Sequence, residues 1–136
     1  MPDSLTPERR SANMARIRSD NTRPEMVVRR LAHAMGYRFR LHRRDLPGKP
    51  DLVFPRRKKV VFVHGCFWHQ HPGCRDGRIP GTNRAYWEPK LARNVERDEA
   101  VQSALREAGW RVKVVWECEA IDAEALAVEL RAFFDS

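Results

Sequence analysis

The chain has 136 residues, of which 42% are hydrophobic and 32% are charged, and its formal net charge is +8. This size predicts one soluble globular domain with a single core and is too small for two domains. No apolar run approaches the roughly 20 residues that cross a bilayer, and the first ten residues do not resemble a signal peptide. We therefore expect a cytoplasmic protein that is not bound to a membrane. Its three cysteines would be reduced there, which favours metal ligation or burial over disulfides.

Positive charge is concentrated in the N-terminal part of the chain. Residues 1–59 contain sixteen Lys or Arg and six Asp or Glu, whereas residues 60–136 contain ten and twelve. Such one-sided charge suits a surface that follows nucleic-acid phosphates, although a merely soluble basic protein is the alternative. The basic turn 56–59, together with Arg38 and Arg40, is the expected source of phosphate contacts.

The predicted elements begin after a polar, Arg-rich segment, residues 1–21, which we expect to form an arm separate from the domain of residues 22–136. Thr22 and Glu25 have the spacing of a capping box, so a helix is predicted to begin at Thr22. Gly36 is expected to end it. The other elements follow from alternating or helical spacing and are strands 37–42, 51–54, 59–64 and 111–116 and helices 88–108 and 122–134.

This order of elements predicts an α/β fold with a mixed β-sheet flanked by helices. Residues 46–50, LPGKP, are expected to form a turn, and strands 51–54 and 59–64 are expected to form a hairpin with a buried inner strand.

The segment HGCFWHQHPGC, residues 64–74, follows that inner strand and is rich in metal-ligand side chains. Cys66, His71 and Cys74 lie in one loop, and Cys118 follows the strand 111–116. If the two strands end at the same edge of the sheet, the four side chains can converge as a closed, tetrahedral zinc site. The alternative is three buried cysteines that act as small hydrophobic residues.

His64 and His69 remain near Asp51, which begins the other hairpin strand. A carboxylate there could hold Mg²⁺ and a histidine could activate water, which are the parts that phosphodiester hydrolysis needs. Asp98 lies near the centre of the apolar stripe of helix 88–108, with Asn94 one turn before it. A carboxylate aimed at a core needs a partner, which could be an arginine or the histidine and metal cluster.

The strings LPGKPDLVF, VFVHGCFWHQH, YWEPKLARNVERD and GWRVKVVWEC closely resemble the Vsr, or very-short-patch-repair, DNA mismatch endonucleases. The resemblance extends over about residues 10–118. It implies a fold like type II restriction endonucleases, with a structural zinc site and an N-terminal DNA-binding arm. It also implies a strand-specific, Mg²⁺-dependent nick on the 5′ side of the T in a T:G mismatch, the lesion left when 5-methylcytosine deaminates.

The implied partner is double-stranded DNA with a T:G mismatch, and mismatch-repair proteins and a DNA polymerase would act afterwards. We expect a monomer associated with the nucleoid. Two broader alternatives stay open on the residues alone. One is a restriction-like nuclease of the same fold with another DNA target, and the other is a non-catalytic, zinc-stabilised DNA-binding module.

The resemblance also implies roles for individual residues. Asp51 would bind Mg²⁺ together with the backbone carbonyl of Val63, and His69 would be the general base. Supporting catalytic roles fall to His64, Asp98 and Glu25. The zinc ligands would be Cys66, His71, Cys74 and Cys118.

The implied DNA contacts are an aromatic wedge of Phe67, Trp68 and Trp87, with Met14 inserted from the minor groove and a further contact from Asn94. Unstacking is less costly at a mismatch, so a wedge also selects for damaged pairs. The position of the three aromatic residues in or near polar segments favours exposure. The alternatives are that they are core residues and that Met14 docks the arm.

Two residue identities differ from related enzymes. The wider nuclease superfamily has an acidic-x-Lys pair where this chain has Phe62-Val63-His64, and some relatives have Thr where Val63 stands. If only the backbone carbonyl contacts the metal, the change at Val63 is harmless. For Glu25, a purely structural role as the capping-box residue competes with catalysis.

Overall fold

A computed structural model describes residues 22–79 and 81–136. The predicted arm, with Met14, lies outside the described residues. The helices and strands follow one another as α2 (Arg23–Ala34), β1 (Arg40–Leu41), β2 (Leu52–Phe54), β3 (Lys59–His64), α3 (Arg84–Glu107), β4 (Arg111–Trp116) and α4 (Ala123–Asp135). This sequence of a helix, three strands, a helix, a strand and a helix confirms the predicted order.

The four strands form one mixed sheet in the order β1-β2-β3-β4. β1, β2 and β3 pair antiparallel, whereas β3 and β4 pair in parallel. Val61 in the middle of β3 therefore lies between Leu52 of β2 and Lys113 of β4. Because β3 and β4 are parallel and in register to their last residues, His64 lies beside Trp116 and both strands end at the same edge.

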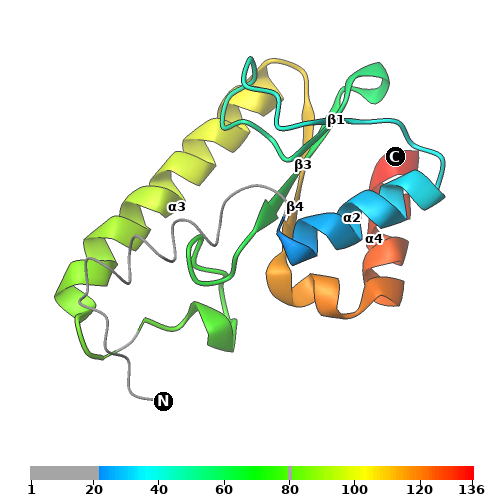
Figure 1. The fold of residues 1–136 in the computed structure, drawn as a ribbon. Helices are drawn as coiled ribbons and strands as arrows, with labels where there is room; N and C mark the ends of the chain where they lie inside the picture. Colours follow the sequence, from blue (N-terminus) through cyan, green and yellow to red (C-terminus); the bar gives the residue numbers. More distant parts are fainter. Residues whose placement is uncertain (1–21, 80) are drawn as a thin grey trace.

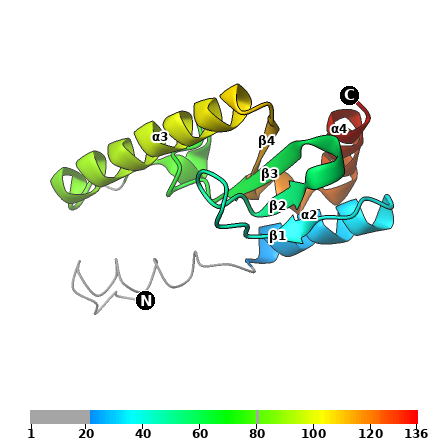
Figure 2. The same ribbon diagram turned by 90° about the horizontal axis from the view of Figure 1, so that it is seen from above.

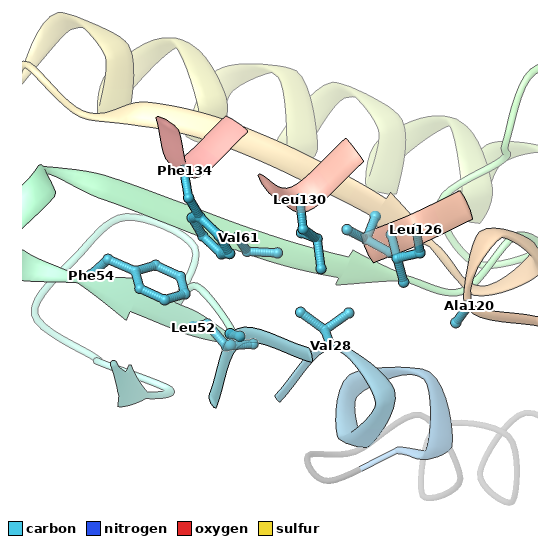
Figure 3. Packing of buried hydrophobic residues seen from close by; sticks show 10 residues of the cluster. Val28, Leu52, Phe54, Val61, Ala120, Leu126, Leu130 and Phe134 are labelled. Atoms are coloured by element: carbon cyan, nitrogen blue, oxygen red, sulfur yellow. The ribbon is translucent and has the colours of Figure 1, made fainter. Parts of the chain in front are cut away.

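Helices cover both faces of the sheet, with α2 and α4 on one side and α3 on the other (Figures 1 and 2). Alternate residues of β3 supply the two interfaces. Val61 packs with Val28 of α2 and Leu130 of α4 in the larger core (Figure 3). Val60 packs instead with Leu105 of α3. The residues that follow β3 therefore emerge from a strand fixed on both faces.

The first helix begins as predicted, since the Thr22 hydroxyl oxygen accepts a hydrogen bond from the Glu25 backbone N–H at 3.4 Å. The strand expected over residues 37–42 is shorter, because only Arg40–Leu41 pairs with β2. His42 has a φ of 49°, and this left-handed conformation cannot continue a strand. Tyr37 packs against the core without pairing.

The long helix begins at Arg84 rather than at the predicted residue 88, with Pro89 inside it. The extra turn brings Trp87 onto the buried side of the helix, beside Leu91. Packing of this large ring outweighs the missing backbone N–H of Pro89. No helix in the described ranges is both long and apolar enough to span a membrane.

Lys59 was expected to contact phosphates, and this prediction is wrong. Its side chain is buried, and its Nζ donates hydrogen bonds to backbone oxygens of Phe133, Phe134 and Ser136 at 2.7, 2.8 and 2.9 Å. Burial lowers the pKa of this ammonium group, but the end of α4 provides the negative dipole that compensates a cation. Arg38 and Arg40 are exposed, so their predicted phosphate contacts stay predictions.

Candidate functional site

Three groups of potential ligand side chains lie within the described residues. They are the Cys/His group (Cys66, His71, Cys74, Cys118), the His/Asp group (His64, His69, Asp98) and the Glu/His/Asp group (Glu25, His42, Asp51). In each group, one ligand atom per residue lies within 4.8 Å of the others. The first two groups take residues from the segment that follows β3.

Asp51 immediately precedes β2, and its carboxylate continues the hydrogen bonding of the sheet. Its Oδ2 accepts a hydrogen bond from the backbone N–H of Val63 on β3 at 2.7 Å. Asp51 and His64 lie on the face of the sheet that packs against α3. Side chains two residues apart in a strand point to the same face, and Asp51 and His64 are each two residues from a residue packed on that face, Val53 and Phe62. They line one cleft of about 640 Å³, as predicted from the hairpin.

The His/Asp group lies in the same cleft. The rings of His64 and His69 stack with centroids 3.8 Å apart and planes 8° apart. His69 Nδ1 lies 2.6 Å from Asp98 Oδ2, so Asp98 is partnered by a histidine and not by the alternative arginine. An ionised carboxylate can only accept, so Nδ1 carries the proton and a neutral His69 has its lone pair on Nε2.

Glu25 takes part in the third group in addition to its place at the start of α2. Its side chain is only 2% exposed, and Oε2 lies 2.8 Å from His42 Nε2 and accepts a hydrogen bond from the Arg29 guanidinium. The role of Glu25 is therefore more than that of a helix cap. Sequence reasoning missed His42, because the alternation of residues 37–42 placed it on the exposed side of a strand.

The Cys/His group has the composition predicted for zinc. His71 Nδ1 faces two sulfur atoms, at 3.4 Å from Cys118 Sγ and 3.7 Å from Cys66 Sγ. The His71 ring is held by stacking on Trp116, with centroids 4.3 Å apart. Burial raises the pKa of the Cys66 thiol to about 12 and also raises the pKa of Cys118. Both thiols must lose a proton to bind a metal.

The loop that carries these ligands is closed tightly around them. A Cβ at Gly77 would lie 3.1 Å from the carbonyl oxygen of His71 and 3.2 Å from that of Cys66. Glycine at this position therefore lets the chain pass close to the backbone of both ligand residues, where a larger residue would push them apart by a few tenths of an ångström. Three thiolates and one imidazole at this separation fit a tetrahedral ion such as Zn²⁺.

Two aromatic residues of the predicted wedge are not exposed, contrary to expectation. Trp68 and Trp87 are 8% and 3% exposed and pack with Leu91, whereas Phe67 is only partly buried at the margin of this aromatic cluster. The early start of α3 turns Trp87 inward, and the two indole rings then cover each other edge to face. Whether the three residues insert into DNA stays a prediction.

Asn94 is buried one turn before Asp98 and connects α3 to the loop after β3. Its Nδ2 donates to the backbone oxygen of Trp68 at 3.2 Å, and its Oδ1 accepts from Arg97 at 2.9 Å. Both ends of the amide therefore take part in contacts within the protein. These contacts give Asn94 a part in fixing the loop, and its predicted contact with DNA stays a prediction.

Comparison with known proteins gives a consistent assignment. The family model "DNA mismatch endonuclease Vsr" matches residues 2–75. The chain is 56% identical over 135 residues to the type II nicking enzyme V.XorIIP of Xanthomonas oryzae pv. oryzae, covering 99% of this chain and 98% of that protein. It is 42% identical to the DNA mismatch endonuclease Vsr of Escherichia coli, covering 88% of this chain and 76% of that protein. With the cleft and its histidine, carboxylate and cysteine groups in place, these matches show that the chain belongs to the Vsr family of DNA mismatch endonucleases.

Proposed function

We propose that the protein is a Mg²⁺-dependent endonuclease that nicks one strand of double-stranded DNA on the 5′ side of the T in a T:G mismatch. Family membership supports hydrolysis of mismatched DNA. The mixed sheet with Asp51 at the beginning of β2 supports a fold like the type II restriction endonucleases. The observation that carries the proposal is the Asp98-bound His69 in the same cleft as Asp51.

Asp51 and the backbone carbonyl of Val63 are the proposed ligands of the catalytic metal. Both supply oxygen atoms, which Mg²⁺ prefers. The hydrogen bond from Val63 N–H to Asp51 Oδ2 fixes the two residues relative to each other before any ion binds. A Mg²⁺ ion held there would offset negative charge on the oxygens of the scissile phosphate.

His69 is the proposed general base. With Nδ1 donating to Asp98 at 2.6 Å, the ring is oriented and its Nε2 can accept the proton of a water molecule. His64 stacks on this ring and restricts its rotation. Asp98 also stabilises the imidazolium that forms when Nε2 takes up the proton. Glu25 is proposed to support the same site from α2.

Zn²⁺ is the proposed occupant of the Cys/His group, where it would have a structural role. The group joins the loop after β3 to Cys118 after β4, and the same loop carries His69. Binding there would therefore hold the general base in place. We further propose that the protein acts as a monomer and that mismatch-repair proteins and a DNA polymerase process the nick.

A nicking assay tests this proposal directly. End-labelled duplexes with a T:G pair and the matched C:G pair are incubated with the protein, with and without Mg²⁺. We expect one nick, 5′ of the T, in the T:G duplex only and only with Mg²⁺. Equal cutting of both duplexes would indicate a nuclease with another target, and binding without cutting would indicate a non-catalytic module.

A further inference from the structure

The Glu/His/Asp group is built from three different parts of the chain, and His42 contacts the other two. Glu25 lies in the first turn of α2, and Asp51 immediately precedes β2. The His42 ring reaches Glu25, with 2.8 Å between Nε2 and Oε2. Its backbone N–H donates to the backbone oxygen of Asp51 at 3.2 Å. One residue therefore fixes the spacing between two carboxylate-bearing residues.

The Glu25 side chain is buried, so its carboxylate oxygens need hydrogen-bond partners within the protein. Burying an ionised carboxylate is costly unless hydrogen bonds or cations compensate it. Arg29 supplies one partner from one turn further along α2. His42 supplies the other from outside the helix, on the chain that pairs with Asp51. Arg29 alone would leave the carboxylate held only along its own helix, whereas His42 directs it toward Asp51.

The backbone of His42 is adapted to this double contact. Its φ of 49° ends β1 and lies in the left-handed region, which is uncommon for residues other than glycine but which histidine, asparagine and aspartate adopt more often than most. The hydrogen bond to Asp51 follows directly after the last pair of β1 and β2, Leu41 with Leu52. The side chain, which an extended strand would direct elsewhere, is thereby aimed at the start of α2.

We propose that His42 is a positioning residue of the active site, which holds the Glu25 carboxylate toward Asp51 so that both carboxylates serve the same metal and its water ligands. This inference rests on the proposed binding of Mg²⁺ at Asp51. It gives Glu25 a function that a helix cap does not need. The ligand atoms of Glu25, His42 and Asp51 already lie within 4.8 Å of one another.

Two substitutions at His42 separate its side chain from its backbone. Asparagine tolerates the left-handed conformation but is too short to reach Glu25. Glutamine extends an amide N–H to about the distance of the imidazole Nε2. H42N should therefore remove the contact with Glu25 without disfavouring the left-handed backbone at residue 42. H42Q should restore the contact. H33N makes the same chemical change at an exposed histidine in the last turn of α2 and is the matched control.

The readouts are single-turnover nicking of the T:G duplex as a function of Mg²⁺ concentration, affinity for the same duplex without metal, and thermal unfolding. For H42N we expect a nicking rate about 10- to 100-fold lower, which is the range for losing a hydrogen bond to a charged group. We also expect a higher half-saturating Mg²⁺ concentration. DNA affinity should stay within about twofold of the wild type, well below the tenfold change that a lost contact gives. H42Q should recover most of the rate, and H33N should match the wild type.

Two results would overturn the inference. One is a wild-type rate and Mg²⁺ dependence in H42N. The other is an equal loss in H42N and H42Q that follows a lower unfolding temperature, which would mean that His42 only stabilises the fold. Failure of the wild type to nick the T:G duplex would instead refute the proposed function, so the two failures are distinguishable. T22A adds a further control, because it removes the helix cap but leaves the contact between Glu25 and His42.

Discussion

The His/Asp group and the Cys/His group take residues from one short segment after β3, yet they are built in opposite ways. His69 is already oriented by Asp98 at 2.6 Å and by stacking on His64. In the Cys/His group, burial raises the pKa of the Cys66 thiol to about 12, although the His71 imidazole lies 3.7 Å from its sulfur. The first group is organised by the protein itself, whereas the second brings thiols together at a cost that a bound metal would offset.

This difference indicates which group depends on metal for its shape. A general base has to be aligned before the substrate arrives, and hydrogen bonds to a fixed helix provide that alignment. A structural ion can instead be part of folding, since its ligands need to be ordered only once the ion is bound. Changes in the His/Asp group should therefore act directly on catalytic rate, whereas changes in the Cys/His group should act first on stability.

The largest expected effect is the loss of catalysis in D51A. Removing the carboxylate proposed to hold Mg²⁺ should lower the nicking rate by about 10³-fold or more, since a bound metal contributes several kcal/mol to the stabilisation of the transition state. Binding to the T:G duplex, measured without metal, should remain. The control is D45A, which removes an exposed carboxylate paired with Arg43. Retained turnover in D51A would remove Asp51 from the mechanism.

C118S should lower stability, and it should affect the nicking rate only through the loop that carries His69. Loss of one of four ligands should release the ion and lower the free energy of unfolding by about 3 kcal/mol, the gain expected from a ligand present at about 100 times its Kd. Zinc content is measured by mass spectrometry and stability by thermal unfolding with and without a chelator. All three cysteines belong to the group, so no cysteine outside it can serve for a matched substitution. The control is therefore the wild type treated with chelator. An unchanged unfolding temperature with no zinc in the wild type would contradict the site.

D98N should reduce the rate without reducing stability. Replacing the carboxylate weakens both the orientation of His69 and the stabilisation of its protonated form, so a loss of about 10²-fold is expected. Single-turnover rates at saturating Mg²⁺ provide the measurement. E99Q changes an exposed carboxylate on the next residue of α3 and should have no effect. If both variants behave alike, the contact between His69 and Asp98 is not used in catalysis.

The smallest expected effect concerns the aromatic cluster. Phe67 is the partly exposed member, so F67A should reduce the preference for T:G over C:G duplexes by about tenfold, the value of one stacking contact. Binding constants for the two duplexes give this ratio. W87A removes a buried ring and should instead lower stability. Uniform weakening of both duplexes by F67A would argue against insertion of Phe67 at the mismatch.

Much of the fold and of the site could be predicted because local patterns determined them. The capping residue Thr22 marks the start of α2, and two apolar runs around a basic turn mark the hairpin. Convergence of Cys118 with the loop after β3 required only that the two strands be parallel, which they are. A carboxylate on an apolar stripe needs a partner, which the sequence left open between an arginine and the histidine and metal cluster, and the partner is His69.

The errors concern residues whose positions depend on tertiary packing. The side chain of His42 is directed by a positive φ, and alternation along residues 37–42 gives no sign of it. The burial of Lys59 depends on where α4 ends, which lies far away in the sequence. Trp87 was expected to be exposed because it lies at the polar entry to the predicted helix, but α3 begins earlier, at Arg84, and the indole ring packs beside Leu91. None of these outcomes follows from spacing alone.

The central position of β3 has a consequence for the motions that the protein can undergo. All six of its residues pair with β4, its first three residues also pair with β2, and Val63 N–H donates to the carboxylate of Asp51. The amide hydrogens of this strand should be among the slowest to exchange with solvent, at a rate set by global unfolding. Local opening can loosen the loop after β3, while the parallel pairing of β3 with β4 holds the strand that carries Val63 in place.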